Sequence, residues 1–226
     1  MVTISVIIPA YNEEANIKEL LDTVQMRAIG NHEYIVSVSG TDATASIARR
    51  AGARVIQGGL RPVALNVGAS VATGEVLYFL HADTLPPQDW DELIIEAYIR
   101  GAQSGSFRLK FDSSHILLVY FAWFTRFSWS VARFGDQSLF VSKAIFQEIG
   151  GFDKNLQIME DNEIVRRLKK VSTFVVIPKE VITSARKYHK HGLYRLQFAY
   201  IVITVLYYCR VPQDKILVIY QKQLSH

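Results

Sequence analysis

The chain has 226 residues, of which half are hydrophobic and a fifth are charged, a composition that suits one large or two small folded domains and excludes an intrinsically disordered protein. The net charge of +4 is too small to indicate nucleic-acid binding, and a single cysteine, Cys209, excludes an internal disulfide. The amino terminus lacks a basic lead and a small-residue cleavage site, so we expect no signal peptide and a cytoplasmic protein.

The first 83 residues alternate β-branched runs with helical patterns. We expect strands at 4–8, 34–38, 54–56 and 76–80 and helices at 17–24, 43–51 and 62–72. This alternation predicts an α/β fold with a mostly parallel central sheet flanked by helices, as in Rossmann-like proteins. Neither a glycine-rich dinucleotide fingerprint nor a Gly-Lys-Ser/Thr phosphate loop is present in the sequence.

The second half continues with expected helices at 89–100, 143–149 and 160–170 and strands at 104–111, 139–141 and 174–177. The aromatic-rich stretch 115–134 is interrupted by Arg126 and Arg133, which argues against a membrane span. We expect it to be a helix that packs on the domain or lies partly in a lipid interface.

A second apolar block, 193–209, follows a basic cluster of Arg186, Lys187, Lys190 and Arg195. Two interpretations remain open: an amphipathic helix that covers the sheet or forms a homodimer, or a segment that rests on an anionic membrane. The whole chain is expected to form one domain, with a nucleotide-binding half at 1–84, an acceptor-side half at 85–186 and a basic, apolar helical segment at 187–226.

Asp83 ends the apolar run that begins at Val76. At the carboxyl end of a buried parallel strand, a carboxylate lies where open α/β sheets bind ligands, and it can hold a cation or a ribose hydroxyl. The alternative is that Asp83 only begins the turn into Pro86-Pro87.

Three short motifs occur in a characteristic order: Pro9-Ala10-Tyr11-Asn12-Glu13, Leu80-His81-Ala82-Asp83 and Met159-Glu160-Asp161. In this order they resemble the signature of family 2 glycosyltransferases with the GT-A fold. Similar segments are Gly40 to Thr44, Arg61 with Leu65 to Ala69, Gly135-Asp136-Gln137 and Gly150-Gly151-Phe152. The tail from Thr183 to Arg186 resembles the small bacterial radical-SAM/selenodomain-associated transferase 2 subgroup.

The resemblance implies a nucleotide-sugar site. Its expected substrate-binding residues are Pro9, Ala10, Tyr11, Glu13, Ser37, Arg61, His81, Ala82, Asp83 and Glu160. Tyr11 can stack on the base and Arg61 can neutralise the diphosphate, whereas Asn12 and the acids after it can also be a helix start. Asp83 is the expected ligand of Mg²⁺ or Mn²⁺, and His81 is expected to be hydrogen-bonded in preference to binding metal.

By resemblance to the family's Glu-Asp pair, Asp161 is the expected general base. One displacement at the anomeric carbon needs a carboxylate beside the acceptor hydroxyl and inverts the configuration. Glu160 is expected to cap the helix.

Ser37 stands where the family usually has an aspartate that contacts the nucleotide, if the turn aligns without a gap. The missing charge-assisted hydrogen bond would weaken donor binding by roughly ten to a hundredfold.

The resemblance therefore implies a metal-dependent, inverting glycosyltransferase that moves a hexose from a nucleotide-diphosphate sugar, by default UDP-glucose, to a hydroxyl acceptor. The aromatic block and the apolar tail favour a lipid-linked acceptor and peripheral contact with the inner face of the membrane. The alternatives are a nucleotidyltransferase and a non-catalytic, membrane-associated nucleotide-binding module.

Overall fold

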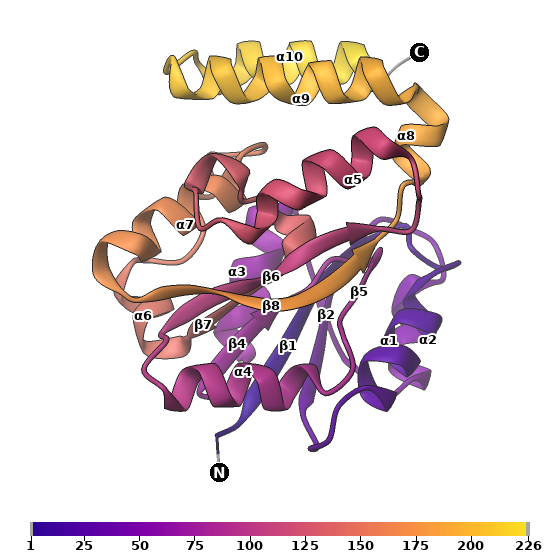
Figure 1. Cartoon of the computed structure of the whole chain (residues 1–226). Helices are drawn as coiled ribbons and strands as arrows, with labels where there is room; N and C mark the ends of the chain where they lie inside the picture. Colours follow the sequence, from indigo (N-terminus) through magenta and orange to yellow (C-terminus); the bar gives the residue numbers. More distant parts are fainter. Residues whose placement is uncertain (1, 225–226) are drawn as a thin grey trace.

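The computed structural model describes residues 2–224, which fold around one eight-stranded sheet with the strand order β3-β2-β1-β4-β7-β6-β8-β5 (Figure 1). The strands are β1 (Ile4–Tyr11), β2 (Glu33–Ser39), β3 (Arg54–Gln57), β4 (Val76–Phe79), β5 (Thr84–Leu85), β6 (Ser104–Phe111), β7 (Leu139–Ser142) and β8 (Phe174–Thr183). The first four strands pair in parallel, as does β8 with β6, whereas β7 is antiparallel to β4 and β6, and β5 is antiparallel to β8. The expected α/β fold is confirmed, with a mixed sheet.

Helices cover both faces of the sheet. They are α1 (Ile17–Met26), α2 (Thr44–Arg50), α3 (Arg61–Val71), α4 (Trp90–Ile99), α5 (Ile116–Trp123), α6 (Lys143–Glu148), α7 (Glu160–Val171), α8 (Arg186–His191), α9 (Leu193–Tyr208) and α10 (Gln213–Leu224). Side chains of α1 and α4 share one hydrophobic cluster, and those of α3, α6 and α7 share the cluster on the opposite face.

Strand β4 lies at the centre of the sheet because all four of its residues are apolar. Val76 and Tyr78 pack into the cluster with α1 and α4, and Leu77 and Phe79 pack into the cluster with α3, α6 and α7. Successive side chains of a strand point to opposite faces, so an unbroken apolar run is buried on both. The chain emerges from this strand toward Asp83.

The stretch after β6 differs from the expected single helix over 115–134. Helix α5 ends at Trp123 and is followed by three 3₁₀ turns, η1 (Phe124–Arg126), η2 (Ser130–Ala132) and η3 (Gly135–Gln137). The cause is Arg133, which is buried and donates to the backbone carbonyls of Thr125 and Phe127 and to Ser106 Oγ. These carbonyls bind a side chain in place of helical amides, so the chain folds around the guanidinium.

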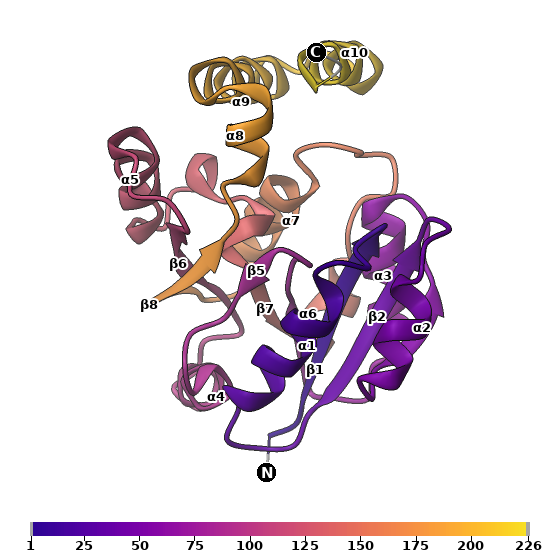
Figure 2. The same cartoon turned by 90° about the vertical axis from the view of Figure 1, so that its right-hand side faces the viewer.

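The C-terminal helices α9 and α10 lie side by side above the carboxyl edge of the sheet (Figures 1 and 2). They enclose a third, small core in which Ile203 and Ile216 pack on Met159, the residue before α7. Within residues 2–224, no helix combines the length and apolarity needed to cross a bilayer. The last two residues of the expected segment 187–226 lie outside the described residues.

Candidate active site

Charged side chains from distant parts of the chain meet at the carboxyl ends of β1 and β4, which are adjacent and parallel. The residues that meet there are Glu13, Arg61, His81, Asp83, Asp136, Glu160, Asp161 and Arg186. Arg61 begins α3, and Glu160 and Asp161 begin α7, so both helix N-termini point at this edge. A helix N-terminus favours negative charge, which suits the two acids on α7.

Arg61 is the centre of the cluster. Its Nη2 lies 2.6 Å from Asp161 Oδ2, and its Nη1 lies 3.1 Å from Glu160 Oε1. Burial opposes the charge of the guanidinium, but the carboxylates of Asp161, Glu160, Asp83 and Asp136 outweigh it and raise the pKa of Arg61. The arginine therefore places one positive charge among four acidic side chains.

His81 also contacts Arg61, through its Nε2. Arginine has no acceptor atom, so this ring nitrogen must be unprotonated and accept a hydrogen bond. Burial, together with the nearby Arg61 and Lys187 charges, lowers the pKa of His81 well below its usual range, which keeps the ring neutral. The structure thus places His81 as a hydrogen-bond acceptor for Arg61.

Glu160 and Asp161 have different environments although they are adjacent. The Glu160 side chain is only 3% exposed, against 17% for Asp161. Burial raises the pKa of Glu160 to about 7, although Arg61 counteracts it. Its Oε1 lies at ion-pair distance from Arg61 but outside hydrogen-bond geometry. Asp161 is the more accessible acid of the two and makes the direct hydrogen bond.

Asp136 belongs to the same cluster, although its sequence motif predicted no role for it. Burial and the charges of Asp161 and Asp83 raise its pKa to about 7, and its Oδ1 is buried without a hydrogen-bond partner. The preceding Gly135 lies so close to the centre that an added Cβ would collide with Arg61, Asp161 and His81. The signal was present in the sequence as Gly135-Asp136-Gln137.

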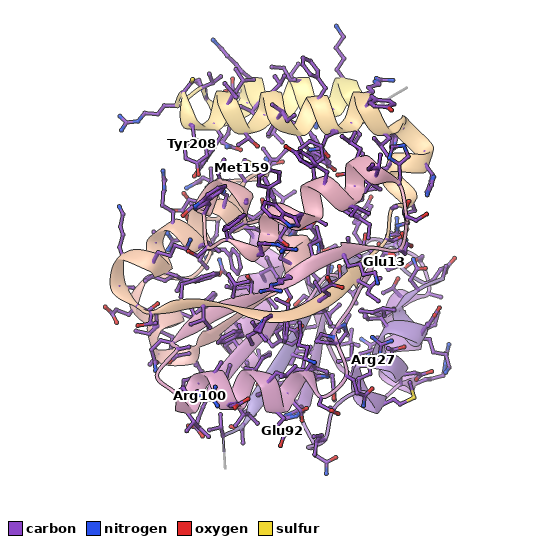
Figure 3. The ribbon with its side chains drawn as sticks, viewed as in Figure 1. Glu13, Arg27, Glu92, Arg100, Met159 and Tyr208 are labelled. Atoms are coloured by element: carbon purple, nitrogen blue, oxygen red, sulfur yellow. The ribbon has the colours of Figure 1, made fainter. Side chains whose placement is uncertain are left out.

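Arg186, at the start of α8, is the second basic residue of the site and was also missed. Its Nη2 lies 2.7 Å from Glu13 Oε1 and 3.6 Å from Asp83 Oδ2. The hydrogen bond to Glu13 raises the pKa of Arg186. Figure 3 shows Glu13 at the edge of the sheet below the C-terminal helices. The guanidinium therefore supplies positive charge beside Asp83, the expected metal ligand.

The Asp83 carboxylate is an oxygen ligand, which suits a hard divalent cation. Across the described residues 2–224, no three or more His, Cys, Asp or Glu side chains converge closely enough to enclose a metal ion. Magnesium in phosphate-transfer sites is usually held by one or two carboxylates together with substrate phosphates. Asp83 as a single protein ligand fits that arrangement. Its carboxylate already has a cationic neighbour, the Arg186 guanidinium at 3.6 Å.

The remaining expected residues are spread along the edge. Tyr11 ends β1 and is 70% exposed, so its ring is accessible for stacking, whereas Ala10 and Ala82 are buried and Pro9 is half-buried. Ser37 does not reach the edge. It is fully buried in the middle of β2, its Oγ has no hydrogen-bond partner, and it faces Gly68 of α3.

The C-terminal helices are joined to the acidic turn. Met159 lies in the small core under α9 and α10, close to Tyr208 in Figure 3. The Tyr208 hydroxyl donates to Asn162 Oδ1 at 3.0 Å, and Asn162 is fully buried directly after Asp161. Helix α9 therefore fixes the residues on both sides of Glu160 and Asp161.

Comparison with known proteins adds a family assignment. The profile of glycosyl transferase family 2 matches residues 5–116. A 4,4'-diaponeurosporenoate glycosyltransferase of Staphylococcus haemolyticus (strain JCSC1435) is 33% identical over 113 residues, which is 46% of this chain and 30% of the relative. The chain thus spans about a third of that relative's length.

Solved structures share the fold at low identity. A mannosyltransferase of Pyrobaculum calidifontis, in complex with GDP-Man and Mn²⁺, has a TM-score of 0.72 and 18% identity, covering 98% of this chain and 70% of the other. Glucosyl-3-phosphoglycerate synthase of Mycobacterium tuberculosis, with Mn²⁺, UDP and glucosyl-3-phosphoglycerate, has a TM-score of 0.62 and 20% identity, covering 93% and 81%. These matches confirm the expected fold.

Proposed function

Since residues 5–116 belong to glycosyl transferase family 2, we propose that the chain transfers a hexose from a nucleoside-diphosphate sugar to a hydroxyl of an apolar acceptor. The observation that carries the proposal is the convergence of Asp83, Glu160 and Asp161 around Arg61 at the carboxyl edge of the sheet. A nucleotidyltransferase is disfavoured by the family match, and a non-catalytic module has no use for several carboxylates held together in a confined space.

The donor lies along the ends of β1, β2 and α3. Tyr11 stacks on the base, Glu13 bonds polar atoms of the nucleoside, and the diphosphate lies at the N-terminus of α3 beside Arg61. The N-terminus of an α-helix attracts phosphate through its free amides and dipole, and Arg61 adds a guanidinium that can bind two phosphate oxygens. UDP-glucose is the default donor. The mannosyltransferase with GDP-Man makes GDP-mannose the alternative to test.

Asp83 would hold Mg²⁺ or Mn²⁺ beside the donor diphosphate. When bound, the cation offsets the negative charge that grows on the departing diphosphate. The two solved relatives that contain Mn²⁺ support this assignment. Arg186 lies on the same side as Asp83 and Glu13 and adds positive charge for the diphosphate.

Asp161 removes the proton of the acceptor hydroxyl as that oxygen attacks the anomeric carbon. It is more exposed than Glu160 and accepts a direct hydrogen bond from Arg61. When the donor binds, Arg61 can leave Asp161 and bind the diphosphate. A general base at this position contributes about 10²- to 10⁴-fold to the rate. One displacement inverts the anomeric configuration.

The acceptor approaches along the segment from α5 to η3. This segment exposes Ile116, Tyr120, Trp123 and Trp129, and its last turn begins at Gly135, which lies against Arg61, Asp161 and His81. The named substrate of the Staphylococcus relative supports a lipid-type acceptor. Residues 1–84 then form the donor half, 85–186 the acceptor half and 187–226 a helical segment at a membrane face.

The test is calorimetric titration of UDP, GDP, UDP-glucose and GDP-mannose into the protein with and without Mn²⁺. We expect Mn²⁺-dependent binding of one nucleotide series that Asp83→Asn abolishes. Asp22→Asn, a change of an exposed acid on α1, is the matched control and should bind as the wild type does. Absence of nucleotide binding, or binding by Asp83→Asn with the same Mn²⁺ dependence, would contradict the proposal.

A further inference from the structure

Helix α9 exposes a continuous apolar stripe. Tyr194, Phe198, Ile201 and Val205 recur at helical spacing and are between 46% and 74% exposed. The opposite side of the same helix buries Leu196, Ala199 and Ile203. A helix on the surface of a soluble domain normally turns a polar face outward, so a helix that is apolar on both sides lacks a covering partner for one of them.

The surroundings of the stripe are strongly basic. Residues 186–222 contain seven Lys and Arg but one acid, Asp214, so this segment carries a net charge of +6, whereas the whole chain carries +4. The seven bases, all exposed, are Arg186, Lys187, Lys190, Arg195, Arg210, Lys215 and Lys222. The rest of the chain therefore carries a net charge of −2, and the positive charge is concentrated in the segment that contains the apolar stripe.

We infer that the α9 stripe and its basic surroundings form a docking surface for an anionic lipid bilayer. Large apolar and aromatic side chains bordered by lysine and arginine are the pattern of a helix that lies in the membrane interface, where the apolar face enters the acyl boundary and the bases contact anionic headgroups. A second copy of the chain fits this surface less well. A symmetric dimer would bring the same patch of +6 charge against itself, and like charges oppose each other across an interface.

The docked orientation has a consequence for the site. One turn beyond Val205, the Tyr208 hydroxyl bonds Asn162 beside the acidic turn, and the basic run begins at Arg186, which contacts Glu13 and Asp83. A bilayer in contact with the α9 stripe is therefore close to both halves of the site. This part of the inference rests on the proposed transfer to an apolar acceptor, whereas docking itself does not.

The experiment is sedimentation of the full chain with vesicles of phosphatidylcholine containing phosphatidylglycerol, compared with vesicles of phosphatidylcholine alone, without donor or metal. We expect binding to the anionic vesicles that weakens with salt. Phe198→Ser should weaken binding by about tenfold or more, because it removes a large apolar side chain from the interface. Lys187→Gln and Lys190→Gln should each weaken binding to the anionic vesicles by about fivefold.

The matched control is Ile99→Ser, which removes an equally exposed apolar side chain from α4, at the opposite end of the molecule beside Arg100 (Figure 3). It should bind vesicles as the wild type does. Phe198 is exposed, so Phe198→Ser should keep the wild-type Tm. The inference is overturned if the wild type stays in solution with anionic vesicles, if Ile99→Ser and Phe198→Ser bind equally, or if sedimentation velocity shows a dimer that Phe198→Ser dissociates. The sedimentation experiment contains no donor, so a failure to bind vesicles would not bear on nucleotide binding, which calorimetry tests separately.

Discussion

Arg61 Nη2 lies 2.6 Å from Asp161 Oδ2. The residue proposed to bind the donor diphosphate is therefore paired with the proposed general base before the donor binds. The guanidinium therefore occupies the carboxylate oxygen that would take the acceptor proton. Donor binding would draw the guanidinium to the diphosphate and release Asp161 for the acceptor hydroxyl. The pair thereby links donor binding to activation of the base.

Asp161→Asn tests the base directly. Asparagine keeps the shape and an acceptor for Arg61 but cannot take the proton, so we expect kcat to fall by at least about 10²-fold while the donor Kd changes little. Nucleoside diphosphate release, with 4,4'-diaponeurosporenoate or a long-chain alcohol as acceptor, measures kcat, and calorimetry measures Kd. Glu148→Gln, an exposed acid on α6, is the control. An unchanged kcat would remove Asp161 from this role.

Arg61→Gln should reduce both donor affinity and stability. Glu160 is almost fully buried and loses its guanidinium partner, which we expect to cost about 1 to 2 kcal/mol at pH 8, since Arg61 itself is 36% exposed and partly screened. That corresponds to a Tm lower by roughly 2 to 8 °C. Loss of a charge-assisted phosphate contact should raise the donor Kd by about tenfold or more. Arg49→Gln on α2 should change neither quantity, and an unaltered Kd in Arg61→Gln would refute the phosphate contact.

The sequence predicted the fold well because its signals are local. The apolar run of β4 and the helical spacing of Ile17, Leu20, Leu21 and Val24 each specify an element and its buried face without knowledge of distant residues. The stretch after β6 was misread as one helix, since its conformation depends on the buried guanidinium of Arg133 binding carbonyls. A buried arginine that determines a loop has the same local sequence pattern as an arginine on a helix surface.

The site was predicted only in part. Asp83, Arg61 and Asp161 were predicted because short motifs contain them, and the structure brings these three side chains together, while their roles stay predictions. Asp136 and Arg186 were not assigned because their proximity arises from tertiary pairing: η3 leads into β7, which lies beside β4, and the pairing of β5 with β8 brings the start of α8 to Asp83. Ser37 was placed at the site from an ungapped alignment, but strand alternation turns its side chain toward α3.

Asp136 should make the metal-free protein less stable as the pH rises. Its pKa is about 7 in the folded chain because burial and the charges of Asp161 and Asp83 disfavour ionisation, against about 3.8 ordinarily. Between these values the unfolded chain has lost the proton that the folded chain keeps, so this contribution to stability is complete below about pH 4 and is lost as the pH rises to about 7. We expect the wild-type Tm to fall between pH 5 and pH 8, and Asp136→Asn to flatten that dependence. Parallel Tm profiles for the two proteins would contradict the assignment.

Asp91 makes the opposite contribution, far from the site. It is 2.8 Å from His32 Nε2, both side chains are nearly inaccessible, and it accepts hydrogen bonds from the amides of Ile29 and Gly30. Burial alone would raise the pKa of Asp91, but these bonds lower it, so its stabilisation is present above about pH 4 and is lost as the pH falls through the lowered pKa. Asp91→Ala should reduce the free energy of unfolding by about 3 to 5 kcal/mol. Urea denaturation at pH 7 measures the loss, and a change below 1 kcal/mol would show that the buried pair contributes little.

Tyr208→Phe separates positioning of the acidic turn from donor binding. The variant keeps the ring of α9 but leaves Asn162 Oδ1 without its 3.0 Å donor, and a lost hydrogen bond of about 0.5 to 1.5 kcal/mol loosens the turn that carries Asp161. We expect kcat to fall by about three- to tenfold with the donor Kd unchanged. Tyr207→Phe is the matched control, because it removes the neighbouring hydroxyl, 3.4 Å from Arg166, on the same helix. Equal losses in the two variants, or a weaker donor affinity in Tyr208→Phe, would mean that α9 acts on the fold as a whole and not on the acidic turn.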